Sequence, residues 1–319
     1  MHKPSAMHRH PGLALILVAA ALAGFAAAGN AHADGPRVVV SIKPVHAIVA
    51  AVMAGVAAPE LLVKGGGSPH TYAMRPSQAR SLNDAELVFW VGGNLETFLR
   101  KPLSALAGKA RLIKLMAIEG MTLYPTRAGG AWERHAEQAP QDAAHGALDA
   151  HVWLDPANAK RIASAAAAAL TETDPANRAA YAANAERFAA RIDALDAELR
   201  AALAPLKHVP YAVFHDAYQY FEQRYGLNAV GAVTISPERR PGARRLRQIR
   251  ATIRAFSARC VFHEPQFEPA LLQNVVEGTG ARVGVLDPLG AELEPGADAY
   301  FALMRGLARG LAECLEAGR

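Results

Sequence analysis

The chain has 319 residues and a formal net charge of +5 at pH 7. This length is sufficient for two domains of ordinary size, each with its own hydrophobic core. The mild charge argues against a nucleic-acid-binding protein, and we interpret the arginine cluster over residues 239–250 as a solvent-exposed helix face.

The first 33 residues have the composition of a secretory signal peptide. Lys3 and Arg9 precede an apolar run from Leu13 to Ala28, and residues 31–33 fit an A-x-A cleavage site. The run is shorter than the roughly 20 residues of a membrane-spanning helix. A lipid anchor is disfavoured, because there is no cysteine near the cleavage site. We expect a periplasmic mature chain that begins at Asp34, with its formal charge reduced from +5 to +3.

Short apolar and β-branched runs alternate with longer helical patterns throughout the mature chain. This alternation predicts an α/β fold in two lobes of similar build, each with a parallel sheet covered by helices. The runs lie at 38–42, 61–63, 87–91 and 112–115 in the first lobe, and at 211–214, 229–234, 260–262 and 282–286 in the second.

One long helix is expected between the lobes. Asp174 fits its N-cap, Pro175 fits its first position, and Pro205 ends it. Apolar residues three and four positions apart predict one buried face along about 40 Å of helix. We expect an N-terminal lobe at 34–157, connecting helices at 158–207 and a C-terminal lobe at 208–319.

Residues 126–150 lack periodicity and contain glycines, scattered acidic residues, His135 and His145. This composition predicts a long mobile surface loop. The two histidines and the acidic residues either hold a second metal ion loosely or are incidental, and the sequence favours neither interpretation.

Four potential metal ligands lie next to predicted strands or helices. His70 and His215 follow strands, and His151 precedes the helix that leaves the first lobe. Asp287 ends the last strand. Ligands collect beyond the carboxyl ends of parallel strands, so these residues can face one cleft. Three imidazoles with an open or weak fourth position are typical of zinc, and we therefore predict a Zn²⁺ site.

The remaining histidines and motifs suggest no second chemistry. We assign His46, His208 and His263 structural or supporting roles, with His263 as the first substitute if a predicted ligand is wrong. The sequence contains no H-E-x-x-H, G-x-S-x-G, P-loop or Rossmann motif. The glycine run at 65–67 lacks the Lys-Ser/Thr of a P-loop, and we expect it to form a flexible loop that presents His70.

Cys260 and Cys314 are the only cysteines. In an exported chain a structural disulfide is the first expectation. Two buried thiols or a soft metal site remain as alternatives, although no C-x-x-C spacing supports the latter.

Several stretches together resemble the periplasmic zinc-binding proteins of high-affinity zinc ABC importers (ZnuA type). The resemblance spans nearly the whole mature chain, and its motifs lie at 68–76, 151–156, 213–218, 264–267 and 286–290. It implies two (β/α)₄ lobes joined by one long helix, with zinc bound between them. It also implies that the zinc ligands are His70, His151 and His215.

The resemblance further implies a disulfide between Cys260 and Cys314 and an ABC permease of the inner membrane as partner. Asp287 corresponds to a ligand of manganese-binding relatives that water can replace in zinc binders, so it is a conditional fourth ligand. Manganese and iron relatives tend to carry a carboxylate where this chain has His215, which favours zinc. The loop at 126–150 has fewer histidines than that of many zinc-binding relatives, so an auxiliary site there does not follow.

We expect a monomeric binding protein rather than an enzyme, and three alternatives remain. One is an Mn²⁺ or Fe²⁺ receptor of the same family. Another is a zinc-dependent hydrolase with a metal-bound water, for which Glu264 and Asp287 are the candidate bases. An adhesin is the third, and the missing lipidation cysteine argues against it.

Overall fold

The first sheet consists of four parallel strands in the order β2-β1-β3-β4. A computed structural model provides the structure, and it describes residues 1–2, 35–106, 108–127, 148–234, 242–267 and 270–317. The strands are β1 (Val38–Val40), β2 (Glu60–Leu61), β3 (Leu87–Trp90) and β4 (Arg111–Lys114). The connections contain α1 (Lys43–Val52), α2 (Pro76–Asp84), η1 (Thr97–Leu99), α3 (Arg100–Ala105) and η2 (Leu115–Ala117).

The second sheet repeats this topology, with parallel strands in the order β6-β5-β7-β8. Its strands are β5 (Tyr211–His215), β6 (Ala229–Thr234), β7 (Cys260–His263) and β8 (Arg282–Val285). Its helices are α6 (Gln219–Tyr225), α7 (Ala243–Ala255), α8 (Ala270–Val276) and α9 (Ala299–Glu316). Each predicted apolar run contains one of the observed strands to within one residue, so the predicted two-sheet α/β fold is confirmed.

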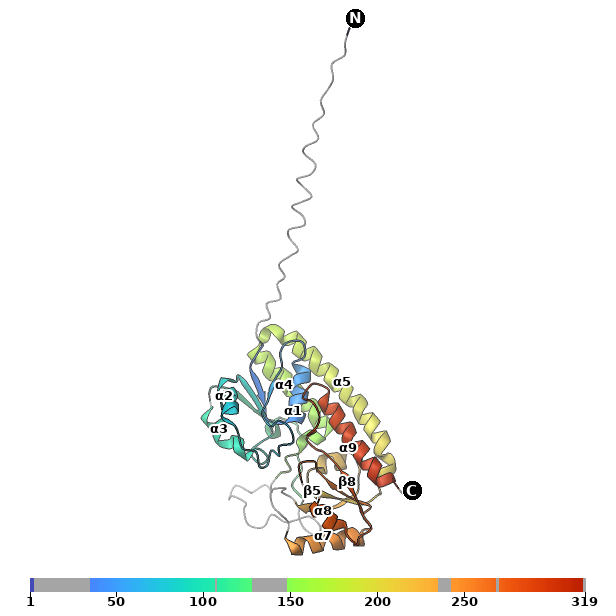
Figure 1. The fold of residues 1–319 in the computed structure, drawn as a ribbon. Coiled ribbons are helices and arrows are strands. Elements are labelled where there is room, and N and C mark those ends of the chain that lie inside the picture. Colours follow the sequence, from blue (N-terminus) through green and yellow to red (C-terminus); the bar gives the residue numbers. More distant parts are fainter. Residues whose placement is uncertain (3–34, 107, 128–147, 235–241, 268–269, 318–319) are drawn as a thin grey trace. The chain divides into compact units, whose positions relative to one another are not determined.

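Helices α4 (Pro156–Thr173) and α5 (Arg178–Leu203) connect the two sheets, after η3 (Val152–Leu154). The predicted long helix is present, but it begins with a 3₁₀ turn, η4 (Pro175–Asn177), and ends in another, η5 (Ala204–Leu206). Asp174 is the N-cap residue of this first turn and Pro175 holds its first position, as predicted. The Asp174 carboxylate accepts hydrogen bonds from the side chains of Asn177 and Tyr181, both at 2.7 Å. Figure 1 shows α5 lying beside α9.

One continuous apolar core extends from the first sheet to the second. It includes buried side chains of β1, α1, α4, α5, β5 and α9. Each sheet has one smaller apolar cluster on its other face. The cluster of the first sheet includes residues of α2 and α3, and that of the second sheet includes residues of α7 and α8. The two sheets therefore share one close-packed apolar interior.

The disulfide between Cys260 and Cys314 joins the start of β7 to the last turns of α9, with the two Cα atoms 6.3 Å apart. This confirms the pairing implied by the family resemblance. The predicted signal peptide and residues 128–147 of the predicted loop lie outside the described residues. Among the helices that the structure describes, none is long and apolar enough to cross a membrane.

Candidate metal centre

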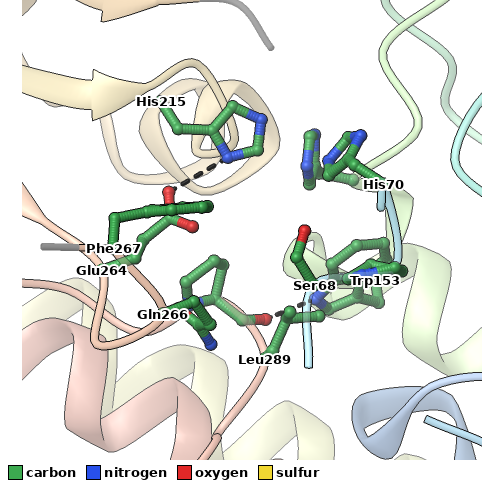
Figure 2. A pocket seen from close by; sticks show the side chains of 11 residues that line it. Ser68, His70, Trp153, His215, Glu264, Gln266, Phe267 and Leu289 are labelled. Carbon is green, nitrogen blue, oxygen red and sulfur yellow. Dashed lines mark hydrogen bonds and ion pairs between the residues drawn. The ribbon is translucent and has the colours of Figure 1, made fainter. Parts of the chain in front are cut away.

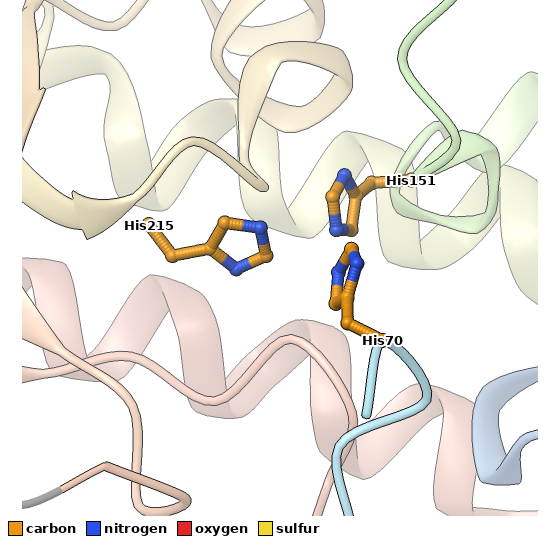
Figure 3. Close-up of side chains that lie close together, drawn as sticks. All are labelled: His70, His151 and His215. Atoms are coloured by element: carbon orange, nitrogen blue, oxygen red, sulfur yellow. The ribbon is translucent and has the colours of Figure 1, made fainter. Parts of the chain in front are cut away.

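Three histidines from distant parts of the chain meet at one point (Figure 3). His70 lies between β2 and α2, His151 directly precedes η3, and His215 is the last residue of β5. One ring nitrogen of each lies within 4.8 Å of the others. A tetrahedral zinc ion with Zn–N bonds of about 2.0–2.1 Å places its nitrogens about 3.4 Å apart, so small side-chain rotations suffice for binding.

His215 owes its position to the topology of the second sheet. The chain continues from β5 to β6 on one side and then crosses to β7 on the other, so the strand order reverses at β5. A crevice forms at such a reversal, beyond the carboxyl ends of the strands. The side chain of His215, the last residue of β5, therefore lies where ligands bind in parallel sheets.

The segment that presents His70 is held in place by hydrogen bonds. The Tyr72 hydroxyl donates to the carbonyl of Leu62 at 3.2 Å, and the Gln78 amide donates to the same carbonyl and to the Tyr72 hydroxyl. We predicted a flexible loop at this position. The hydrogen bonds tie Tyr72 to the end of β2 and to α2, but they involve none of the residues 65–67, so a flexible glycine run stays a prediction.

A buried carboxylate orients His151. Asp149 Oδ1 accepts a hydrogen bond from the backbone N–H of His151 at 2.9 Å and lies 2.7 Å from its Nδ1. The carboxylate assigns the Nδ1 proton, which directs Nε2 toward the cluster. Asp149 is itself held, because its carbonyl accepts from the Tyr220 hydroxyl at 2.8 Å.

A second buried carboxylate orients His215. Glu264 follows β7, and its Oε1 lies 3.0 Å from Nδ1 of His215. Burial raises the pKa of Glu264 to about 8, and the nearby His151 opposes this shift. The sequence suggests Glu264 only as a candidate catalytic base and does not indicate a role for Asp149. The usable signals were an acid two residues before His151 and another directly after β7, the strand adjacent to β5.

His70 is the ligand candidate with the clearest unsatisfied atom. Its Nε2 is buried and has no hydrogen-bond partner among the described residues. Burial, together with the neighbouring His215 and His151, lowers the pKa of His70 well below its ordinary value. Buried polar atoms of proteins are normally paired, and a neutral imidazole nitrogen is able to bind a metal ion.

The structure does not bring Asp287 into this cluster. Asp287 Oδ1 accepts from the backbone N–H groups of Leu289 and Gly290 at 3.0 and 2.9 Å, and Oδ2 accepts from that of Ala291 at 2.5 Å. Gln266 Nε2 also donates to Oδ1 at 3.3 Å. Its assignment as a fourth ligand stays a prediction, and these hydrogen bonds argue against it.

The other described histidines also lie outside the cluster. His46 Nε2 lies 3.0 Å from the carbonyl of Pro59, and His263 Nδ1 lies 3.1 Å from that of Glu264. His263 is thus a neighbour of the residue that orients His215, as its position at the end of β7 suggests. His135 and His145 lie outside the described residues.

The cluster lines a cavity of about 10 Å³ (Figure 2). This volume is about that needed by one water molecule. The cavity suits a single ion, because an organic substrate would require a much larger space. The remaining lining residues are Ser68, Pro69, Trp153, Glu264, Gln266, Phe267, Pro288 and Leu289.

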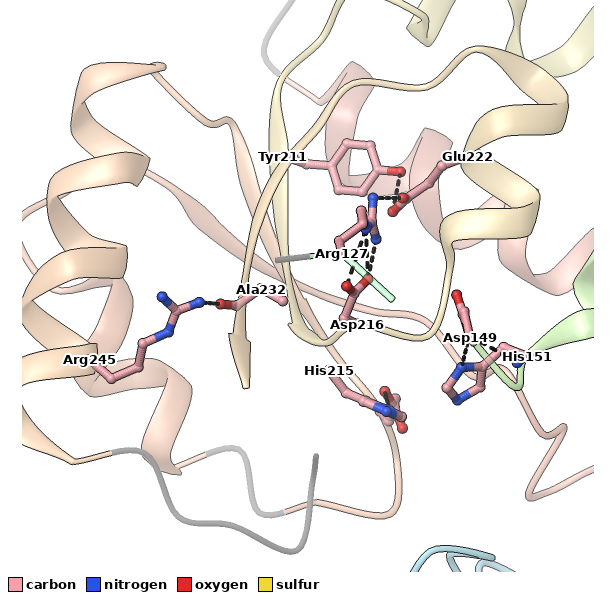
Figure 4. Close-up of polar contacts among 10 residues, drawn as sticks. Arg127, Asp149, His151, Tyr211, His215, Asp216, Glu222, Ala232 and Arg245 are labelled. Atoms are coloured by element: carbon pink, nitrogen blue, oxygen red, sulfur yellow. Dashed lines mark hydrogen bonds and ion pairs between the residues drawn. The ribbon is translucent and has the colours of Figure 1, made fainter. Parts of the chain in front are cut away.

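A buried ion-pair network lies beside His215 (Figure 4). The Arg127 guanidinium donates to both carboxylate oxygens of Asp216 and, at 2.5 Å, to Glu222 Oε2. Asp216 directly follows His215. Arg127 lies three residues after Tyr124, whose carbonyl accepts from the backbone N–H of Asp149 at 2.9 Å, two residues before His151. The network therefore fixes the segments that carry two of the three histidines to each other.

Comparison with known proteins identifies close similarities over nearly the whole chain. The family model described as zinc-uptake complex component A, periplasmic (ZnuA), matches residues 38–314. The high-affinity zinc uptake system protein ZnuA of Brucella abortus is 45% identical over 327 residues, which cover 94% of this chain and 98% of that protein.

Solved structures show the same fold. A crystal structure of ZnuA has a TM-score of 0.75 and 30% identity, and the match covers 88% of this chain and 100% of that one. A deletion mutant of ZnuA with zinc bound has a TM-score of 0.74 and 28% identity, with 90% and 100% covered.

Proposed function

Because this chain belongs to the ZnuA family of periplasmic zinc-uptake components, we propose that it captures Zn²⁺ and delivers it to an ABC-type permease of the inner membrane. The observation that carries the proposal is the convergence of His70, His151 and His215 on a cavity the size of one ion. The relatives described above are zinc-uptake proteins by name, and one was solved with zinc bound.

In the proposed complex, Nε2 of each histidine binds the ion. Zinc accepts three neutral imidazoles and a fourth ligand in a tetrahedron, and we assign the fourth position to water. The Asp149 and Glu264 carboxylates accept the Nδ1 protons of His151 and His215, and the cation favours the ionised form of Glu264. Two negative charges behind the ligands then balance the two positive charges of zinc.

Titration of metal-stripped protein with zinc, against a chelator of known affinity, tests this proposal. We expect one tight site per chain. A protein that never competes with the chelator for zinc would contradict the proposed function. The same titration with added manganese tests the alternative of an Mn²⁺ receptor. In such a receptor, a modest concentration of zinc would not displace the bound manganese.

We propose a binding protein without catalytic activity. A zinc hydrolase needs space for a substrate beside the metal-bound water and a free carboxylate as base. The cavity of about 10 Å³ offers no such space. The two candidate bases are engaged, since Glu264 contacts His215 and Asp287 accepts backbone N–H groups.

The remaining parts of the proposal concern export and assembly. We propose that residues 1–33 are removed as a signal peptide and that the mature protein acts in the periplasm as a monomer. We also keep the lobe boundaries predicted from the sequence, with the segment at 158–207 as the connection. Mass spectrometry of the protein recovered from periplasm would give the mature N-terminus.

Zinc affinity should fall by at least about tenfold between pH 7.5 and pH 5.5, because protonated imidazole cannot bind zinc and free histidine has a pKa of about 6.5. Affinity falls toward low pH because protons and the zinc ion compete for the same nitrogens. Burial lowers the pKa of His70, so this residue contributes little to the loss. Chelator competition at several pH values measures the effect, and an affinity that is constant or rises toward pH 5.5 would be incompatible with imidazole ligands.

Replacing Asp149 by Ala should lower zinc affinity by about 10- to 100-fold, the usual effect of removing a carboxylate that orients a histidine ligand. The loss arises because His151 no longer has a fixed tautomer and ring orientation. Asp193→Ala is the matched control, since Asp193 is an exposed acid that pairs with Lys160 at 2.6 Å. Equal affinities of the two variants would remove Asp149 from the site.

A further inference from the structure

Lys43 reaches from the first lobe into a turn of the second. It is the first residue of α1 and is 5% exposed. Its Nζ donates to the backbone carbonyls of Gly290, Ala291 and Leu293 at 2.6, 2.8 and 2.6 Å. An ammonium group has three N–H donors, so these carbonyls account for all of them.

The same turn binds a negative charge on its other side. The backbone N–H groups of Leu289, Gly290 and Ala291 donate to the Asp287 carboxylate. Residues 287–293, which we name the Asp287 turn, therefore lie between an anion and a cation. Its N–H groups face the carboxylate and its carbonyls face the ammonium, so each charge stabilises the arrangement that the other requires.

The Asp287 turn also forms part of the wall of the metal cavity. Pro288 and Leu289 line that cavity together with the three histidines. Trp153, which directly follows the segment of His151, donates from Nε1 to the carbonyl of Pro288 at 2.8 Å. The turn is thus fixed from the first lobe at two points, Trp153 and Lys43.

Movement of the Asp287 carboxylate to the metal would break this arrangement. Three backbone N–H groups would lose their acceptor, and an unpaired donor in this part-buried turn is costly. Lys43 increases the cost, because it holds the carbonyls and so prevents the turn from refolding around a displaced carboxylate. The metal ion consequently binds imidazole nitrogens, while the nearby Asp287 carboxylate does not coordinate it.

We propose that Lys43 is a specificity-determining residue, which withholds Asp287 from the ion by fixing the Asp287 turn. Manganese prefers oxygen ligands, whereas zinc binds well to imidazole, so withholding a carboxylate favours zinc. This inference deepens the proposed function and rests on it. It assigns the choice between the two metals to a contact between residues 247 to 250 positions apart in the chain.

Zinc and manganese affinities of four full-length proteins test the inference: wild type, Lys43→Met, Asp287→Asn and the double variant. Methionine keeps the length of the lysine stem and removes the charge and the donors. We expect Lys43→Met to lower the ratio of zinc to manganese affinity by about tenfold or more, through tighter manganese binding. The double variant should have the wild-type ratio of zinc to manganese affinity, because residue 287 then has no carboxylate that could bind manganese.

Asp287→Asn alone should change zinc affinity by less than about threefold, because the carboxylate does not touch the ion. This arm keeps the inference testable even if Lys43→Met fails to fold. A tenfold loss of zinc affinity in Asp287→Asn would overturn the inference. An unchanged ratio in folded Lys43→Met, or a shift that persists in the double variant, would also overturn it, while zinc binding by the wild type would leave the proposed function intact.

Discussion

Replacing His215 by Ala is expected to lower zinc affinity by more than about 100-fold, which exceeds the effect of losing an orienting carboxylate. The substitution removes one of three nitrogen ligands and leaves Glu264, which is 3% exposed, without its imidazole partner. His70→Ala and His151→Ala should have effects of the same order. Chelator competition with the metal-stripped variants measures the loss.

His208→Ala is the matched control for these variants, since His208 is exposed and lies outside the cluster. Its zinc affinity should equal that of the wild type. Far-UV circular dichroism of each variant separates loss of a ligand from loss of the fold. If all three ligand variants bind zinc as the wild type does, the ion binds elsewhere.

Removing the disulfide by replacing both cysteines with Ala is expected to lower the free energy of unfolding by about 4 kcal/mol. The two residues are separated by 54 positions, so the bond removes considerable freedom from the unfolded chain. Cys260 is also fully buried at the start of β7. Urea denaturation under oxidising conditions, with the m-value compared between the two proteins, measures the change.

The disulfide variant also tests whether the bond affects the metal site. The bond lies at the opposite end of β7 from Glu264, so the folded variant should keep its zinc affinity within about threefold. A loss of stability below about 1 kcal/mol would show that the bond adds little to the fold.

The strands were predictable because each is a short buried run in a parallel sheet. Val38, Val39 and Val40 are all buried, which is why they form a continuous apolar run rather than an alternating one. The start of the long helix was less predictable. Asp174 is the N-cap residue, as predicted, but the first turn is a 3₁₀ turn, and the Asp174 carboxylate binds the side chains of Asn177 and Tyr181.

The convergence of the three histidines was predictable from His70 and His215 after strands, from His151 before a helix, and from the resemblance to zinc-binding proteins. The orientation of their rings was not, because it depends on Asp149 and Glu264 through contacts that no local pattern reveals. Asp287 illustrates the same limit. Its position at the end of β8 suggested a ligand, whereas the backbone N–H groups that follow it occupy both carboxylate oxygens.

Long-range contacts between the lobes were beyond the reach of local patterns. Lys43 stands before a proline at the start of a helix, and nothing in that motif indicates three carbonyl acceptors some 250 residues away. The Arg127 network is a similar case, since Asp216 and Glu222 carry no sequence signal for a partner on another segment.

Native mass spectrometry of the protein purified without added metal tests most directly whether this chain carries zinc on the three histidines. We expect the wild type to carry one zinc ion, and the variant with His70, His151 and His215 all replaced by Ala to carry none. A variant without residues 128–147 should retain the ion, which separates this site from any second ion bound by that segment. Wild-type protein that carries manganese instead, or a triple variant that keeps its zinc, would contradict the proposed site.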